Sequence, residues 1–198
     1  MKTLAEMHTP IFWAEGHPGA LDRENWEIKI TGACERPQTL SWSQLLALPQ
    51  TEVESRLTSV TRWSVNGLWK GVTLKDLLQS VGVLPSCRFV RFWSVGLIYD
   101  TSIPIEIALK EKSLLAHSFN GEFLTEDYGG PVRGFIPYLW GYKSAKSVVR
   151  IELMEYYVSG FWELRGYTDS AKIEAGPCLD LNDDGAIKEI EGPGEVFF

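Results

Sequence analysis

The chain has 198 residues, a formal net charge of −7, 44% hydrophobic residues and 12% aromatic residues. This length and composition predict one well-packed globular domain and exclude a disordered chain. The sequence has a pI of about 5.1 and no basic block, which excludes nucleic acid as an expected partner, because phosphate backbones are bound by clustered Lys and Arg.

The number and spacing of the cysteines and histidines do not indicate a metal site or a set of disulfide bonds. The three cysteines are far apart and lack a Cys-x-x-Cys spacing, and the three histidines are scattered. Such a pattern favours free thiols over disulfides, zinc or iron–sulfur sites. The N-terminus lacks the basic and apolar regions of a signal peptide, and no apolar run reaches membrane-spanning length. We therefore expect a soluble, cytoplasmic protein without a membrane span.

The first third of the chain begins with a polar arm, residues 1–25, which Pro and Gly interrupt. An alternating strand is predicted at 26–32, since every second side chain is apolar. Ser41 is expected to cap a short helix at 42–48 that ends before Pro49. The alternation at 52–60 predicts another strand, with Ser59 at or near its end.

The rest of the chain predicts more β structure than helix. Thr73 is expected to cap a helix at 74–81, because its leucines form one apolar stripe. The Asn120-Gly121 dipeptide is a hairpin turn signal. The remaining predicted elements are strands at 88–94, 97–102, 113–119, 132–137 and 147–156, and a helical turn at 105–109. Together they predict an α+β class: a β-rich fold with short helices.

Two cationic segments lie close together in the sequence. Gly129-Gly130-Pro131-Val132-Arg133 is followed ten residues later by Lys143-Ser144-Ala145-Lys146. An Arg grips an oxyanion with two parallel hydrogen bonds, and a Lys adds a mobile point charge. The apolar stretch between them predicts a buried strand and a glycine-broken loop, which would bring Arg133 and Lys146 to one cleft. The alternative is that Arg133 pairs with a carboxylate such as Glu126 and one lysine is merely solvated.

An upstream segment completes a family pattern. It reads Ser59-Val60-Thr61-Arg62-Trp63-Ser64, followed by Trp69-Lys70-Gly71-Val72-Thr73-Leu74. With both patterns, the chain resembles the molybdopterin-binding oxidoreductase domain of the sulfite oxidase family, especially its short bacterial members. The resemblance covers roughly 26–165 and implies a mixed-sheet, barrel-like fold. We expect an arm (1–25), this domain (26–165) and a tail (166–198).

The resemblance implies a molybdenum–molybdopterin cofactor and a set of contacts to it. Arg133 and Lys146 would hold the pterin phosphate, with Lys146 preferred over Lys143. Ser144 and Ala145 would offer small side chains and backbone N–H groups to the same anion. Weaker matches imply cofactor contacts by Ser94 and His17. Tyr128 stands where the family commonly has a His or Asn, and its uncharged hydroxyl could still donate a hydrogen bond to the pterin or phosphate. A strand-end serine exposed to solvent is the alternative for Ser94.

Two positions depart from the family pattern, Tyr128 and, with the larger consequence, Ser59. Ser59 stands where the family has the cysteine whose thiolate binds molybdenum. A serine oxygen is a harder ligand and loses its proton with more difficulty. Ser59 is nevertheless the expected catalytic residue and molybdenum ligand. Arg62 is expected either to supply positive charge toward a substrate or to form a surface salt bridge.

The tail contains a calcium-loop pattern. Its expected ligands, at loop positions one, three, five and twelve, are Asp180, Asn182, Asp184 and Glu191. Gly and Pro flank the loop where an EF-hand needs helices, so a solvated acidic turn is the alternative.

The resemblance implies oxygen-atom transfer on a small sulfite- or sulfoxide-like substrate. No haem-binding segment is present, so a separate electron-transfer partner is expected. Two alternatives remain: a molybdopterin-binding protein with little turnover, and a calcium-stabilised β-rich interaction module.

Overall fold

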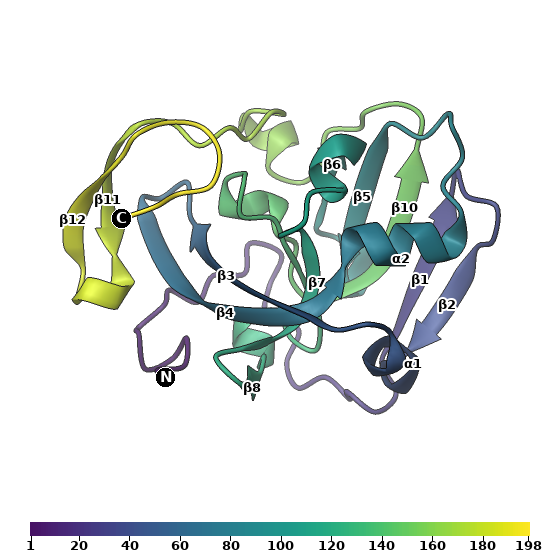
Figure 1. Ribbon diagram of the computed structural model, residues 1–198, viewed down its shortest axis with the longest axis horizontal. Coiled ribbons are helices and arrows are strands. Elements are labelled where there is room, and N and C mark those ends of the chain that lie inside the picture. Colours follow the sequence, from purple (N-terminus) through teal and green to yellow (C-terminus); the bar gives the residue numbers. More distant parts are fainter.

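A computed structural model describes all residues, 1–198. Two β-sheets dominate it (Figure 1). The first sheet has the strand order β2-β1-β10-β5-β6, in which β1 and β10 are parallel and the other neighbours are antiparallel. Its strands are β1 (Glu27–Gly32), β2 (Gln38–Ser41), β5 (Phe89–Ser94), β6 (Asp100–Pro104) and β10 (Val148–Met154).

The second sheet has seven strands in the order β12-β11-β4-β7-β8, with β3 beside β4 and β9 beside β7. Its longest strand, β4, was not predicted as a strand and extends across the molecule below α2 (Figure 1). The strands are β3 (Thr51–Thr58), β4 (Trp63–Thr73), β7 (Leu114–Phe119), β8 (Glu122–Phe123), β9 (Arg133–Phe135), β11 (Gly176–Asp180) and β12 (Ala186–Ile190).

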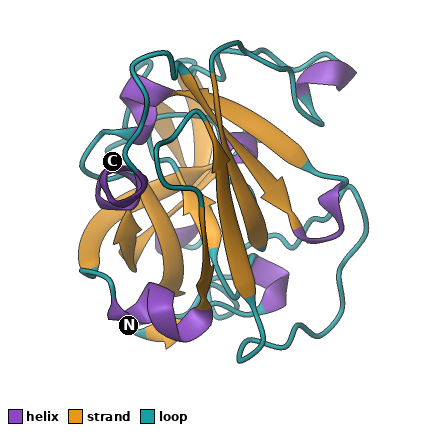
Figure 2. Cartoon of the chain, turned by 90° about the vertical axis from the view of Figure 1, so that its right-hand side faces the viewer, coloured by secondary structure: helices purple, strands orange, loops and turns teal.

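The helices are short and lie around the sheets (Figure 2). Ser41 caps α1 (Trp42–Ala47) through a reciprocal capping box with Gln44, as expected for a serine before a short helix. Thr73 caps α2 (Leu74–Val81), confirming that prediction. The other helices are α3 (Ile105–Ala108) and the 3₁₀ turns η1 (Val95–Leu97), η2 (Glu126–Tyr128), η3 (Gly141–Lys143), η4 (Glu163–Arg165) and η5 (Leu181–Asp183).

Two predicted strands are shorter in the structure. The strand expected at 97–102 begins only at Asp100, because Gly96 has φ 77° and the chain forms η1 first. The strand expected at 132–137 is limited to β9. The N–H of Ile136 donates to the Ser144 side chain (3.0 Å) and Pro137 has no N–H, so pairing cannot continue.

Both end segments pack against the sheets. Leu4 and Met7 of the arm are buried in the smaller hydrophobic cluster together with Leu57 and Trp69. In the tail, β11 and β12 form a hairpin, and β11 pairs in parallel with β4 (Figure 1). The division at 25 and 165 remains a prediction.

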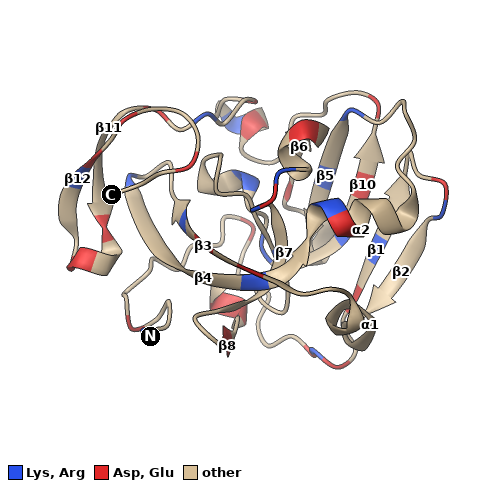
Figure 3. Cartoon of the chain, viewed as in Figure 1, with Lys and Arg blue, Asp and Glu red and all other residues tan.

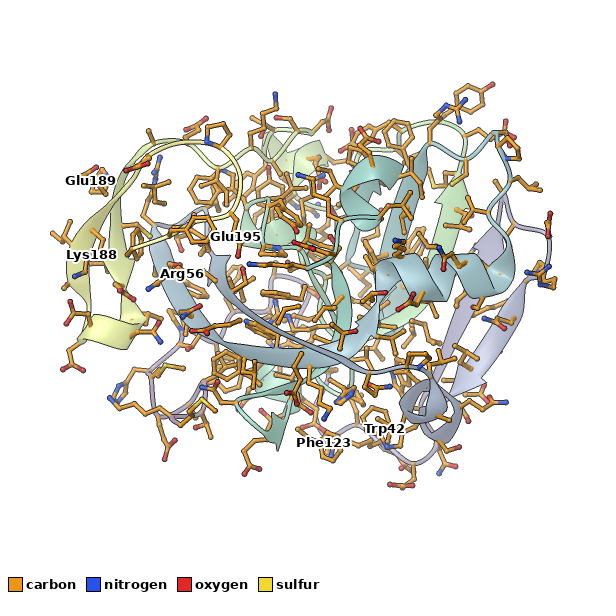
Figure 4. All side chains as sticks on the ribbon, in the orientation of Figure 1. Trp42, Arg56, Phe123, Lys188, Glu189 and Glu195 are labelled. Carbon is orange, nitrogen blue, oxygen red and sulfur yellow. The ribbon has the colours of Figure 1, made fainter.

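The last residues of the chain return to β3. The Glu195 carboxylate accepts hydrogen bonds from the Ser55 hydroxyl (2.5 Å) and the Lys112 ammonium (2.6 Å). Arg56, also on β3, lies under the ring of Phe198 (4.3 Å), and Figure 4 labels Arg56 and Glu195 in this region. The strand that leads to Ser59 is thus covered by the C-terminal segment.

Candidate functional site

A cavity of about 370 Å³ lies between the end of β3, the loop around η3 and the N-terminal arm. Its wall contains Ser59, Arg133 and Lys146, the three residues on which the sequence interpretation depended. Tyr128 and Ser144 also line it. Most of the remaining wall is hydrophobic.

The Arg133 guanidinium is buried without a carboxylate partner. Its side-chain N–H groups donate to the carbonyl oxygens of Tyr128 (2.8 Å), Ser144 (3.1 Å) and Gly134 (3.4 Å). Glu126, the alternative partner, accepts instead from the N–H of Leu21 (3.0 Å). Burial lowers the pKa of Arg133 to about 10. A buried cation without a counter-charge favours binding of an anion.

Lys146 is the second cation of the cavity. Burial, and then the charge of Arg133, lower the pKa of Lys146 to about 7. Its ammonium donates to the carbonyl oxygen of Phe12 and lies 4.7 Å from the centre of the Trp13 ring. An anion placed between Arg133 and Lys146 would stabilise both charges. We call these two cations and the space between them the anion site.

Lys143 points away from the cavity. Its ammonium forms a buried ion pair with Glu163 and donates to the Ser102 carbonyl (2.9 Å) and the Tyr157 hydroxyl (3.2 Å). The 3₁₀ turn η3 ends at Lys143, so the two lysines of the motif face different surroundings. Lys146 is the motif lysine that lines the cavity.

The two small residues between the lysines also differ in placement. Ser144 lines the cavity, and its hydroxyl is occupied by the N–H of Ile136. Ala145 is buried in the main hydrophobic core and does not line the cavity. Its carbonyl accepts from the N–H of Gly134 (2.8 Å), which holds the loop against β9.

Ser59 follows the last residue of β3. Its Oγ lies 2.8 Å from the Thr61 hydroxyl and accepts from the N–H of Thr61 (3.2 Å). The three cysteines are buried and none lines the cavity. The cations therefore fit an anionic phosphate, whereas the donor at the expected metal position is a hard oxygen and not a soft sulfur.

The predicted role of Arg62 in the cavity is not supported by its placement. Arg62 has a left-handed backbone conformation (φ 65°) that turns its side chain toward the tail. It donates there to the carbonyl oxygens of Glu174 (2.9 Å) and Ala175 (3.3 Å). This position agrees with the structural alternative given for Arg62.

Ser94 and His17 also lie outside the cavity wall. Ser94 is fully buried at the end of β5, so the solvent-exposed alternative is wrong. Its contact with a cofactor remains a prediction. His17 Nε2 lies 3.0 Å from a carboxylate oxygen of Asp127. This contact attaches the arm to η2.

The structure adds wall residues that sequence reasoning missed. Trp162 stacks on Tyr167 (4.8 Å between ring centres) and on Phe12 (6.0 Å), giving one aromatic side of the cavity. Glu15 lines the cavity from the arm, and burial raises the pKa of its carboxyl. The only feature of the sequence that could have indicated Glu15 as a wall residue is its position as a single carboxylate near aromatic residues.

The calcium prediction is not supported. The Asp180 carboxylate is engaged in a buried two-point ion pair with Arg56 (2.9 and 3.1 Å). Asn182 is bonded to the backbone of Asn66 on β4, accepting from its N–H (2.6 Å) and donating to its carbonyl (2.8 Å).

The other two expected calcium ligands do not complete a site. Asp184 follows η5, and Glu191 is exposed beyond the end of β12. No group of three or more acidic, His or Cys side chains is placed to hold a metal ion. The loop oxygens serve instead to join the tail to β3 and β4.

Acidic and basic residues are interspersed along the elements (Figure 3). The helices all fall short of the length and apolarity that crossing a membrane requires.

Comparison with known proteins identifies a family and several relatives. The model of the oxidoreductase molybdopterin binding domain family matches residues 14–162. The chain is 33% identical over 159 residues to the uncharacterized oxidoreductase YuiH of Bacillus subtilis (strain 168), covering 80% of each chain. It is 28% identical over 156 residues to the protein-methionine-sulfoxide reductase catalytic subunit MsrP of Campylobacter jejuni, covering 71% of this chain and 52% of MsrP.

The fold is shared with a solved structure. The sulfane dehydrogenase SoxCD from Paracoccus pantotrophus superposes with a TM-score of 0.67 at 21% identity. The match covers 87% of this chain and 46% of that chain. The predicted β-rich, mixed-sheet molybdopterin-binding fold is thereby confirmed. The chain spans about half the length of MsrP and of the SoxCD chain.

Proposed function

The chain belongs to the oxidoreductase molybdopterin binding domain family, and we propose that it binds a molybdenum–molybdopterin cofactor in the cavity between Ser59, Arg133 and Lys146. Membership places it among molybdenum-dependent oxidoreductases. The observation that carries the proposal is the buried Arg133 guanidinium, which has no carboxylate partner and shares its cavity with Lys146.

Each residue has a distinct part in holding the cofactor. Arg133 is fixed by backbone carbonyls, so its orientation toward a phosphate is set before binding. Lys146 would gain a full positive charge beside the phosphate, because a nearby anion raises its lowered pKa. Ser59 would direct its hydroxyl at the metal. A bound cofactor of this class supplies two-electron oxygen-atom transfer.

The charges of the cavity favour a neutral, sulfoxide-like substrate over sulfite. Arg133 and Lys146 would both be engaged by the cofactor phosphate, and Arg62 is turned toward the tail. An anionic substrate would then meet an apolar, aromatic wall and the Glu15 carboxylate. Burying an unpaired anion there is costly. The MsrP relatives are protein-methionine-sulfoxide reductases, which points to the same class of substrate.

A second candidate function is cofactor binding with little turnover. The Ser59 hydroxyl already bonds to Thr61, and the cavity wall contains no cysteine. A serine oxygen donates electron density to a metal differently from a thiolate, so a bound cofactor in this chain would have a changed redox potential.

Electrons would come from a separate protein or a small carrier. The relatives named as subunits support a partner protein for this chain. A cytoplasmic location remains a prediction.

The test is to produce the protein in a molybdenum-replete host and to measure bound molybdenum and pterin fluorescence. We expect a cofactor that co-purifies with the wild type and is lost in Lys146→Met. Absence of cofactor from the wild type would refute the proposal. Reduction of a neutral sulfoxide by the cofactor-loaded protein would show that the protein is an active oxidoreductase. A cofactor-loaded protein without turnover would support the second candidate function, cofactor binding alone.

Ser59→Cys tests the ligand directly. We expect the absorption spectrum of the loaded protein to change when sulfur replaces oxygen next to the metal. Ser43→Cys, an exposed thiol on α1, is the matched control and should leave the spectrum unchanged. An unchanged spectrum in both variants would mean that Ser59 does not face the metal.

A further inference from the structure

The N-terminal arm occupies part of the anion site. The backbone carbonyl of Phe12 accepts a hydrogen bond from the Lys146 ammonium, and the Trp13 ring covers the same group. Glu15 lines the cavity and acts electrostatically on Lys146, although the two do not form an ion pair. The arm thus places one carbonyl and one carboxylate near the cation that a phosphate would need.

The arm is fixed on both sides of this contact but is open in the middle. Leu4 and Met7 are buried in the smaller hydrophobic cluster. Beyond the contact, His17 bonds to Asp127. Between these anchors Phe12 is 62% exposed. The middle of the arm can therefore leave the cavity without unfolding the domain.

The contacts of Lys146 with the arm are weaker than those it would make with a phosphate. A carbonyl is a neutral acceptor, whereas a charged acceptor forms a stronger hydrogen bond. Glu15 has no hydrogen-bonded cation to hold it, and a phosphate entering beside it would be repelled. A phosphate therefore binds at Lys146 at an electrostatic cost as long as the Glu15 carboxylate lines the same cavity.

We propose that residues 10–16 of the arm are a displaceable occupant of the anion site, and that Glu15 controls anion entry by competing for Lys146. The proposal rests on the proposed function, because it assumes that the cavity takes an anionic group. Binding of the anion transfers Lys146 from the Phe12 carbonyl to the ligand. Residues 10–16 then move away from the cavity and carry Glu15 with them.

The experiment uses sulfate as the probe and the 198-residue chain produced without the cofactor. Sulfate remains a dianion across neutral pH, so a change of pH does not change the charge of the probe. Equilibrium dialysis of labelled sulfate at constant ionic strength measures its affinity. Glu15→Gln removes the charge and keeps the shape, and we expect it to bind sulfate about three- to tenfold more tightly than the wild type. Glu24→Gln, an exposed carboxylate on the same arm, should match the wild type.

A second measurement follows the arm itself. Amide hydrogen exchange in residues 10–16 should accelerate when sulfate binds, while exchange in β4 and β7 should not. Equal sulfate affinities of Glu15→Gln and wild type, or an arm whose exchange is unchanged with sulfate bound, would overturn this inference.

The two proposals fail in different ways. Lys146→Met should abolish sulfate binding if the anion site exists. Should wild type and Glu15→Gln both fail to bind sulfate, or should Lys146→Met bind normally, the anion site would be refuted and this inference with it. Sulfate binding that requires Lys146 but ignores Glu15 refutes only the role of Glu15.

Discussion

Arg56 and Asp180 form a buried ion pair that joins β3 to β11 through two hydrogen bonds of 2.9 and 3.1 Å. Their side chains are only 8% and 6% exposed. Because β3 leads directly to Ser59, the tail hairpin holds the strand that positions this serine. The pair gives a structural role to an acidic loop that resembles a calcium site in sequence.

Removing one member of this pair should be strongly destabilising. We expect Asp180→Asn to lower the free energy of unfolding by about 3–5 kcal/mol, because Arg56 would be left buried without its counter-charge. Urea unfolding monitored by tryptophan fluorescence measures the loss. Lys188→Ala breaks an exposed ion pair with Asp183 (2.7 Å) in the same hairpin and should change stability little.

Calcium should leave the melting temperature unchanged, since the loop oxygens already have protein partners. A melting temperature that rises with calcium concentration, and not with magnesium, would restore the calcium site.

Substitution of Lys143 should affect stability, whereas substitution of Lys146 should affect sulfate binding. Lys143→Met leaves Glu163 buried without a cation, so we expect it to lower the free energy of unfolding by about 3–5 kcal/mol. Its sulfate affinity should stay at the wild-type value. Lys146→Met removes a cation that burial disfavours, so it should keep or raise stability while sulfate binding is lost. Loss of sulfate binding in the folded Lys143→Met variant would contradict this division.

Sulfate binding should weaken as pH rises through about 7. Burial and Arg133 lower the pKa of Lys146 to that value, so the ammonium is charged below it and neutral above it in the free protein. The negative charges of Glu15 and Asp127 act in the opposite direction and raise the pKa of Lys146. Dialysis at pH 6, 7 and 8 measures the trend. Lys146→Arg should flatten it, because a guanidinium keeps its charge over this range.

His117 should make the fold less stable in mild acid. Burial, with Lys70 and Arg23, lowers the pKa of His117 to about 4. Between pH 6.5 and 4 the unfolded chain gains this proton and the folded chain does not, so stability falls as pH falls. We expect this residue to contribute a loss of about 1–3 kcal/mol across that interval, measured by urea unfolding at several pH values.

The surroundings of His117 suggest the control. Its ring lies edge-on to Trp42 (5.9 Å) and near Phe123 (5.6 Å), which Figure 4 labels, and its Nε2 bonds to Gln50 (2.9 Å). His117→Gln keeps a hydrogen-bonding side chain without the titration. If this variant loses stability in acid as steeply as the wild type, another group is responsible.

The sequence by itself determined the local elements whose signals lie within a few residues. Ser41 and Thr73 specify the starts of α1 and α2 because a side-chain oxygen satisfies N–H groups in the next turn. The family pattern around Arg133 also determined the fold class. Such features need no knowledge of distant contacts.

Tertiary structure decided which of the motif residues meet. Lys143 and Lys146 are equivalent by charge, yet one is paired with Glu163 and the other faces the cavity. Arg62 follows Ser59 closely, yet a left-handed backbone turns it to the tail. Side-chain direction depends on backbone angles and on partners far along the chain, which spacing alone does not encode.

The contacts of the arm and the tail likewise could not be inferred from the sequence. The sequence separated an arm (1–25) and a tail (166–198) from the rest of the chain, whereas in the fold β11 pairs with β4 and the arm lines the cavity. The sequence pattern predicts Asp180 as a calcium ligand, whereas in the fold its carboxylate pairs with Arg56, which is 124 residues away in the sequence. The structural role of a charged side chain depends on the group that it contacts, and only the folded chain brings that group within hydrogen-bonding distance.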